Sequence, residues 1–131
     1  MVQVKYWDPA DDSIVTGQLA SEQDLPCLLD TVSNLTGTRG HPAVELIRPD
    51  GSSLSIATDG PRCFLVWIDS LEASFHSVGG AEGPVLFFDY FGSWSEAPAE
   101  FTVAMAEALE CARRFVRSGA PDSESVLFEP D

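Results

Sequence analysis

The sequence predicts an α+β fold in which a mainly antiparallel β-sheet carries two helices packed on one face, in the approximate order ββαββββαβ. Short segments of alternating or continuous apolar residues recur between turn residues, which is typical of strands. Two longer segments have apolar residues at helical spacing. The 131 residues suit a single domain over 1–131, because two halves would each be too small to bury a good core.

The chain begins with a predicted β-hairpin. Apolar and polar residues alternate from Val2 to Trp7, and a second strand returns from Ile14 to Leu19. Between them, the segment Asp8–Asp12 favours a turn, because its proline fixes φ and its aspartates can bond the nearby backbone.

The next segment is expected to be a helix that begins after Asp24. This start places Pro26 in the first turn, where its missing N–H does no harm. Ser21 and Asp24 also have capping-box spacing, but a helix begun at Ser21 would place Pro26 too deep. The apolar face holds Leu25, Leu28, Leu29, Val32 and Leu35. Gly37 is expected to end this helix in a left-handed conformation.

The middle of the chain predicts further strands. Residues 43–47 and 54–57 flank the turn dipeptide Asp50-Gly51. The continuous apolar segments Cys63–Ile68 and Val85–Phe91 are expected to be two central strands covered on both faces. Residues 74–84 contain three glycines, and 92–99 are expected to form a loop that carries Trp94.

A second helix is predicted from about Val103 to Ser118, stopped by Gly119 and followed by a short strand over 126–128. Its acids come first and its bases last, which suits the helix dipole. The apolar faces of both helices and both central strands predict a buried core of Leu28, Leu29, Val32, Val66, Ile68, Leu86, Phe88, Leu109, Ala112 and Phe115.

The charge of the chain restricts its partners. Seven Lys and Arg oppose 21 Asp and Glu, which gives a net charge of −14. This charge argues strongly against direct binding to nucleic acid, because contacts to phosphate need clustered Lys and Arg side chains. It argues against binding to anionic membrane surfaces for the same reason. With 44% hydrophobic residues the chain should nevertheless fold. A basic protein is therefore the expected partner.

Residues with catalytic or metal-binding potential form no recognisable motif. The three cysteines lie far apart and are expected to be reduced, buried thiols in a cytoplasmic protein, since no signal peptide or membrane span precedes them. His41 and His76 have no ligand at metal-binding spacing, and the glycine-rich segment 79–84 lacks a phosphate-binding lysine. We therefore expect no enzyme, no cofactor and no metal site.

Acidic and aromatic residues gather around the two apolar strands and the loops that follow them. The candidate binding residues are Asp69, Glu72, Asp89, Trp94 and Glu96. Aromatic residues supply binding energy at interfaces and charges set the encounter rate. Asp89 interrupts an apolar segment, so it should be exposed, paired or part of a site. A second candidate patch is Asp8, Asp11 and Asp12.

Several segments, taken in order, resemble a known family. They are Pro42–Leu46, Leu54-Ser55-Ile56, Ser77-Val78-Gly79-Gly80, Val85–Tyr90, Glu96-Ala97-Pro98-Ala99 and Ala108-Leu109 with Phe115–Pro121 and Val126-Leu127-Phe128. Together they resemble the first-numbered immunity protein family of bacterial polymorphic-toxin systems, which include contact-dependent and secreted toxins. One difference is Phe128, where that family usually has tryptophan.

The resemblance implies a small cytoplasmic protein that binds a cognate toxin domain and blocks its active site. Relatives in that family protect against toxins that attack nucleic acids, such as deaminases and nucleases. A toxin of this kind needs a basic active-site cleft, which an acidic partner can occupy. We expect a monomer or a weak homodimer.

Two other functions stay open from the sequence. In the second, the acidic protein mimics nucleic acid and sequesters a basic host protein. In the third, which ranks well behind, the protein is an enzyme that uses a pair of carboxylates in catalysis.

Overall fold

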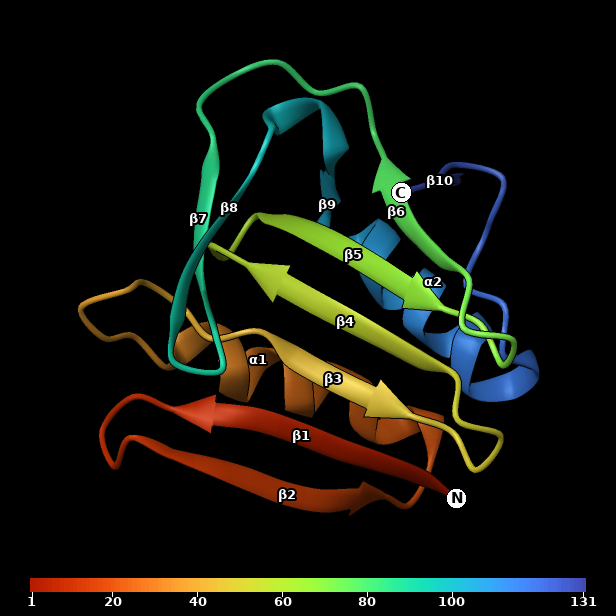
Figure 1. Ribbon diagram of the computed structural model, residues 1–131, viewed down its shortest axis with the longest axis horizontal. Helices are drawn as coiled ribbons and strands as arrows, with labels where there is room; N and C mark the ends of the chain where they lie inside the picture. The colour runs from red at the N-terminus through yellow and green to blue at the C-terminus, as the bar shows by residue number, and fades with distance from the viewer.

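A computed structural model describes residues 1–131 and has the expected α+β architecture, with a mostly antiparallel sheet and two helices (Figure 1). The strands are β1 (Val2–Asp8), β2 (Ser13–Leu19), β3 (Val44–Ile47), β4 (Ser53–Thr58), β5 (Arg62–Ile68), β6 (Ser74–Val78), β7 (Leu86–Tyr90), β8 (Ser93–Ala97), β9 (Thr102–Ala104) and β10 (Leu127–Pro130). The helices are α1 (Leu25–Asn34) and α2 (Met105–Ser118), and short 3-10 helices span Glu22–Asp24 and Ala99–Phe101.

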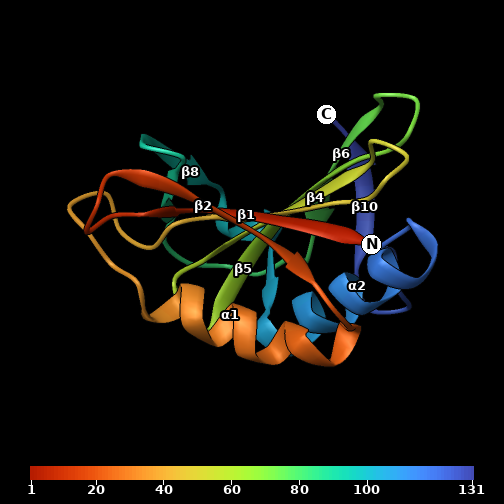
Figure 2. The same ribbon diagram turned by 90° about the horizontal axis from the view of Figure 1, so that it is seen from below.

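The main sheet has the strand order β10-β6-β5-β4-β3-β1-β2, and β9 pairs with β5. Every pair of neighbouring strands in it is antiparallel. Both helices lie on the same face of this sheet, as Figure 2 shows. The main core lies between the helices and the sheet, where Val44, Leu46, Leu54, Ile56 and Leu65 are fully buried.

Helix α1 begins where the sequence predicts, with Asp24 as its N-cap residue and Pro26 in its first turn. The Ser21–Asp24 capping box is also present and caps the 3-10 turn that precedes α1: Ser21 Oγ accepts a hydrogen bond from Gln23 N (3.0 Å). The predicted left-handed end at Gly37 is wrong, because the helix ends at Asn34 and Leu35 is extended. Gly37 is needed instead for a close approach, since a Cβ there would lie 2.7 Å from Pro9 Cβ.

The prediction of two central strands is only half correct. Strand β5 lies in the middle of the main sheet, but β7 pairs with β8 in a separate two-stranded sheet. Three strands were not predicted. The Gly92–Ala99 segment, expected to be a loop, contains β8. Strand β6 has a polar sequence, and the three-residue β9 was absorbed into the predicted helix, which begins at Met105 rather than Val103.

The predicted core is largely confirmed at its centre and wrong at its margins. Leu29, Val32, Leu86, Phe88, Ala112 and Phe115 are buried. Leu28, Val66 and Leu109 are half-buried, and Ile68 is 37% exposed. For Val66 and Ile68 the reason is geometric: β5 has helices against one face, whereas the β7–β8 hairpin covers only part of the other. Of the cysteines, Cys63 and Cys111 are buried as expected, whereas Cys27 is exposed.

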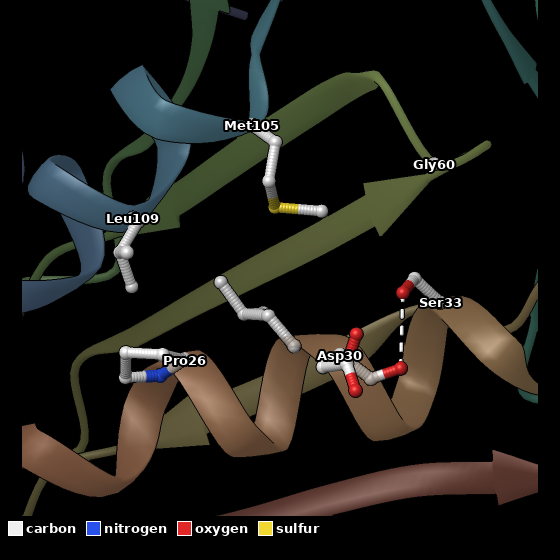
Figure 3. Close-up of a pocket in the computed structure, with 7 residues that line it drawn as sticks. Pro26, Asp30, Ser33, Gly60, Met105 and Leu109 are labelled. Atoms are coloured by element: carbon white, nitrogen blue, oxygen red, sulfur yellow. Dashed lines mark hydrogen bonds between the residues drawn. The ribbon is translucent and has the colours of Figure 1, made fainter.

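A shallow groove of about 310 Å³ separates the two helices (Figure 3). Pro26 of α1 faces Leu109 of α2 across it, and Leu29 and Met105 also line it. Its polar groups contact one another locally, since Ser33 Oγ donates to the backbone oxygen of Asp30 (3.0 Å). The open groove leaves Leu109 half-buried rather than fully packed.

Candidate binding surface

The β7–β8 hairpin stands apart from the main sheet, on the face opposite the helices (Figures 1 and 2). Its inward face carries Leu86, Phe88 and Ala97, which join Ala43 and Ala57 in a second, smaller core. The hairpin is thus attached by few apolar contacts compared with the main core.

The outward face of the hairpin carries an exposed aromatic pair. Phe87 is 45% and Trp94 56% exposed, and their ring centroids lie 5.1 Å apart. Glu96 stands directly opposite Phe87 in the hairpin register and is also exposed. Large aromatic side chains with free surface and a neighbouring carboxylate are suited to a protein interface. We call Phe87, Trp94 and Glu96 the aromatic face.

Asp89 lies directly opposite Trp94 in the hairpin register, and the structure shows it to be paired, which is one of the alternatives that the sequence allows. Asp89 is 1% exposed, and its Oδ2 lies 3.3 Å from Nε of Arg39 in an ion pair. Its Oδ1 accepts a hydrogen bond from Gly92 N (2.8 Å) in the hairpin turn. A buried carboxylate needs such partners, so Asp89 serves the position of the hairpin and has no free surface for a partner protein.

The same arginine joins the two predicted patches. Nη2 of Arg39 lies 3.6 Å from Oδ1 of Asp12, in the turn between β1 and β2. The backbone of Asp89 also bonds the same loop: its N–H donates to the His41 oxygen and its oxygen accepts from Ala43 N, both at 2.9 Å. This Asp12–Arg39–Asp89 bridge ties the hairpin to the body of the protein. Asp8 ends β1, and Asp11 lies exposed in the turn that follows it.

Asp69 and Glu72 do not join the aromatic face. They lie in the turn between β5 and β6, at the other end of the sheet from the β7–β8 turn (Figure 1). Oδ1 of Asp69 accepts hydrogen bonds from Leu71 N (2.9 Å) and Ala73 N (3.0 Å), and Glu72 has a φ of 68°. The five candidate residues therefore do not form one patch, because β7 and β8 form a separate hairpin that is not paired with β5 or β6.

Sequence reasoning missed two contributors to this region, Phe87 and Arg39. Phe87 was assigned to a central strand, because a continuous apolar segment carries no signal of which face is exposed. Arg39 lies in a loop with no motif. Tyr90 lines a groove of about 170 Å³ between the hairpin and β5, together with Val66 and Ile68. Burial in this groove, and secondarily the nearby Glu45 carboxylate, raises the pKa of Tyr90.

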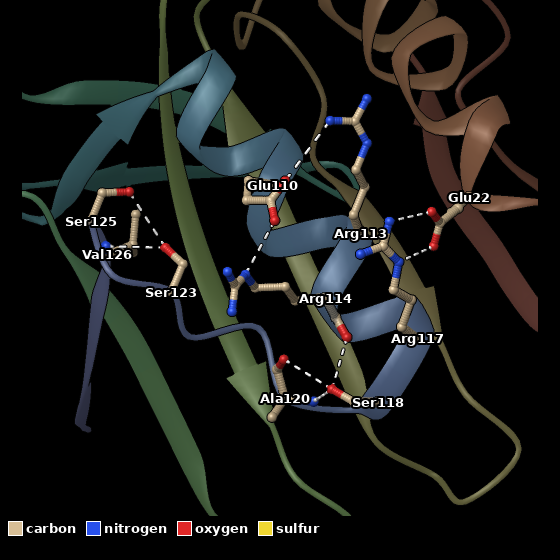
Figure 4. Close-up of polar contacts among 10 residues, drawn as sticks. All are labelled: Glu22, Glu110, Arg113, Arg114, Arg117, Ser118, Ala120, Ser123, Ser125 and Val126. Carbon is tan, nitrogen blue, oxygen red and sulfur yellow. Dashed lines mark hydrogen bonds and ion pairs between the residues drawn. The ribbon is translucent and has the colours of Figure 1, made fainter.

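Most of the basic side chains are already engaged within the chain. Arg117 of α2 forms a two-pronged ion pair with Glu22, with Nε 2.6 Å from Oε2 and Nη2 2.5 Å from Oε1 (Figure 4). Arg113 and Arg114 both pair with Glu110 (Figure 4). Arg48 donates to the carbonyl oxygens of Phe115 and Val116. Most carboxylates therefore have no basic partner within the chain, whereas most arginine side chains are already paired or hydrogen-bonded.

A second polar cluster lies near the chain end. Nδ1 of His76 is 2.6 Å from Oδ1 of Asp131, and Ser74 Oγ bonds the other oxygen of that carboxylate. Ser74 therefore contacts the aspartate and not the histidine, unlike a nucleophile-base-acid relay. No three His, Cys, Asp or Glu side chains are arranged to hold a metal ion.

Comparison with known proteins gives no family assignment. No protein-family model matches the chain, and no curated protein matches it significantly. The resemblance to immunity proteins therefore stays a prediction. Neither helix combines the length and apolarity needed to cross a membrane.

Proposed function

We propose that this chain is an immunity protein that binds and occludes a cognate bacterial toxin domain acting on nucleic acid. The observation that carries the proposal is the aromatic face. Phe87 and Trp94 are in contact, with their rings tilted by 43°, and both are exposed on a hairpin outside the main sheet, beside Glu96. Exposed aromatics at the centre of a protein interface contribute most of its binding energy.

The electrostatics support the same partner. A net charge of −14, with the arginines of α2 paired to carboxylates of the same chain, leaves the surface strongly acidic. A toxin that grips nucleic acid has a basic cleft, and opposite charges accelerate the encounter of two proteins. In this proposal the aromatic face anchors the complex and the surrounding acids steer it into the cleft.

Co-expression with the toxin domain encoded in the neighbouring reading frame tests the proposal. The chain should restore growth and co-purify with the toxin domain in a one-to-one complex. Absence of both rescue and co-purification would contradict it. Capture of several unrelated basic proteins with equal strength would favour the nucleic-acid mimic instead, because a mimic recognises charge spacing rather than one cleft.

A further inference from the structure

Strand β2 forms one edge of the main sheet. Ser13–Leu19 pairs with β1 over seven consecutive residues without a bulge, and no element lies beyond it (Figure 1). An edge strand presents unpaired N–H and C=O groups at alternate residues. These groups are available to an additional strand.

The β2 edge lacks the sequence features that normally prevent another strand from pairing with an exposed edge. Residues 13–19 contain no charged residue and no proline, and Ile14 is 54% exposed. The other edges of the molecule are protected: β9 has only three residues, and the Asp89 backbone of β7 is already bonded to His41 and Ala43. Strand β10 is only four residues long and carries Glu129 and Pro130, and β8 carries Glu96 and is followed by Pro98. Charges, prolines and short length are the usual protection of an edge, so β2 is the exception within this fold.

A groove continues the edge on the helical side. It has a volume of about 440 Å³ and lies between β2 and α1, with Tyr6, Val15 and Leu28 among its apolar lining. Gly17 lines this groove, and a Cβ at Gly17 would have no atom within 4 Å. A strand added to β2 would place alternate side chains into this groove.

The acids around the edge favour a cationic partner, and the one basic residue of the neighbouring strand β1 is Lys5, which lies opposite Thr16. Exposed Asp24 lines the groove beside α1, a helix that contains Asp30 and no basic residue. Exposed Asp11 lies in the turn at the other end of β2. In a two-fold antiparallel pairing of two copies, the acidic turn of one copy would meet the Asp24 end of the other. Like charges then repel, which disfavours a second copy.

We propose that β2 accepts an extended cationic segment of a partner protein as an additional antiparallel or parallel strand, with an apolar side chain placed over Gly17. The partner class is a basic protein with a free strand or extended loop. This surface is separate from the aromatic face, so the inference goes beyond the proposed function and does not depend on it.

Site-resolved amide exchange by NMR tests the inference on the full chain. The probes are the peptide Lys-Val-Lys-Val-Lys-Val-Lys and its counterpart with glutamate in place of each lysine. The lysine peptide should slow exchange at alternate β2 amides by at least about tenfold, and the glutamate peptide should not. The amides of β8 and β10 serve as internal controls. Unchanged β2 exchange with the lysine peptide, or equal protection by both peptides, would overturn the inference.

Two variants at one position test the groove and its charge. Gly17→Lys and Gly17→Gln add side chains of similar length into open space, so both should fold. The lysine variant should bind the lysine peptide at least about tenfold more weakly than the glutamine variant, because it adds a like charge. Equal binding would contradict the role of charge. A dimer that protects β2 without any peptide would show that the occupant is a second copy and would also overturn the proposal.

Discussion

The Asp12–Arg39–Asp89 bridge should set the stability of the hairpin. Replacing Arg39 by alanine leaves the Asp89 carboxylate, whose side chain is 2% exposed, without its basic partner. Breaking a fully buried ion pair costs about 3–5 kcal/mol, whereas an exposed pair contributes about 0–1 kcal/mol. The Arg39 side chain is 33% exposed, so Arg39→Ala should reduce the free energy of unfolding by about 2–3 kcal/mol.

A double-mutant cycle separates the ion pair from other losses. Asp89→Asn removes the charge but keeps an oxygen that can accept the hydrogen bond from Gly92 N. The double variant Arg39→Ala/Asp89→Asn should therefore be more stable than Arg39→Ala alone, by about 1–2 kcal/mol. Urea unfolding followed by tryptophan fluorescence measures all three variants. A loss below about 0.5 kcal/mol for Arg39→Ala, or a double variant that is less stable than Arg39→Ala, would refute this reasoning.

Two further predictions concern titratable groups. The hydrogen bond and charge of Arg117 lower the pKa of Glu22 from its ordinary value of 4.5, so the pair stabilises the fold above that value and the benefit disappears as the pH falls through the lowered pKa. Urea midpoints of the parent and Glu22→Gln should therefore differ at pH 7 and converge as the pH falls through the lowered pKa of Glu22; a constant difference would contradict this sign. Burial raises the pKa of Cys63 and of Cys111 to about 11, whereas Cys27 is exposed. A thiol reagent at pH 8 should modify one thiol per chain rapidly and two only on unfolding, and rapid modification of all three would show that the buried thiols are accessible.

Much of the fold could be predicted because its signals are local. The start of α1 follows from a proline that tolerates only the first helical turn, and the β1–β2 hairpin follows from alternation around a turn rich in Asp and Pro. These features depend on residues close together in the chain. The separate β7–β8 hairpin could not be predicted, because a continuous apolar segment suits a central strand and a half-covered hairpin equally.

The candidate surface was predicted only in part, and for a related reason. Trp94 was found because it lies between serines in a polar segment, and Asp89 was recognised because a charge interrupts an apolar segment. Its actual partner, Arg39, lies 50 residues away in the sequence in a loop without a motif. Ion pairs between distant segments depend on the tertiary fold, and the pattern of neighbouring residues in the sequence does not reveal them. The grouping of Asp69 with Trp94 failed for the same reason, since it required knowing which strands are neighbours.

The dissociation rate of the complex with the toxin domain tests the central proposal most directly. Trp94→Ala should raise this rate by about thirtyfold, the equivalent of a hot spot of about 2 kcal/mol. Leu71→Ala is the matched control, because it truncates an 87% exposed apolar side chain in the distant β5–β6 turn. The account predicts fast dissociation for Trp94→Ala and the parent rate for Leu71→Ala, with both variants as stable as the parent. A complex that dissociates at the parent rate with Trp94→Ala would contradict the aromatic face as the toxin-binding anchor.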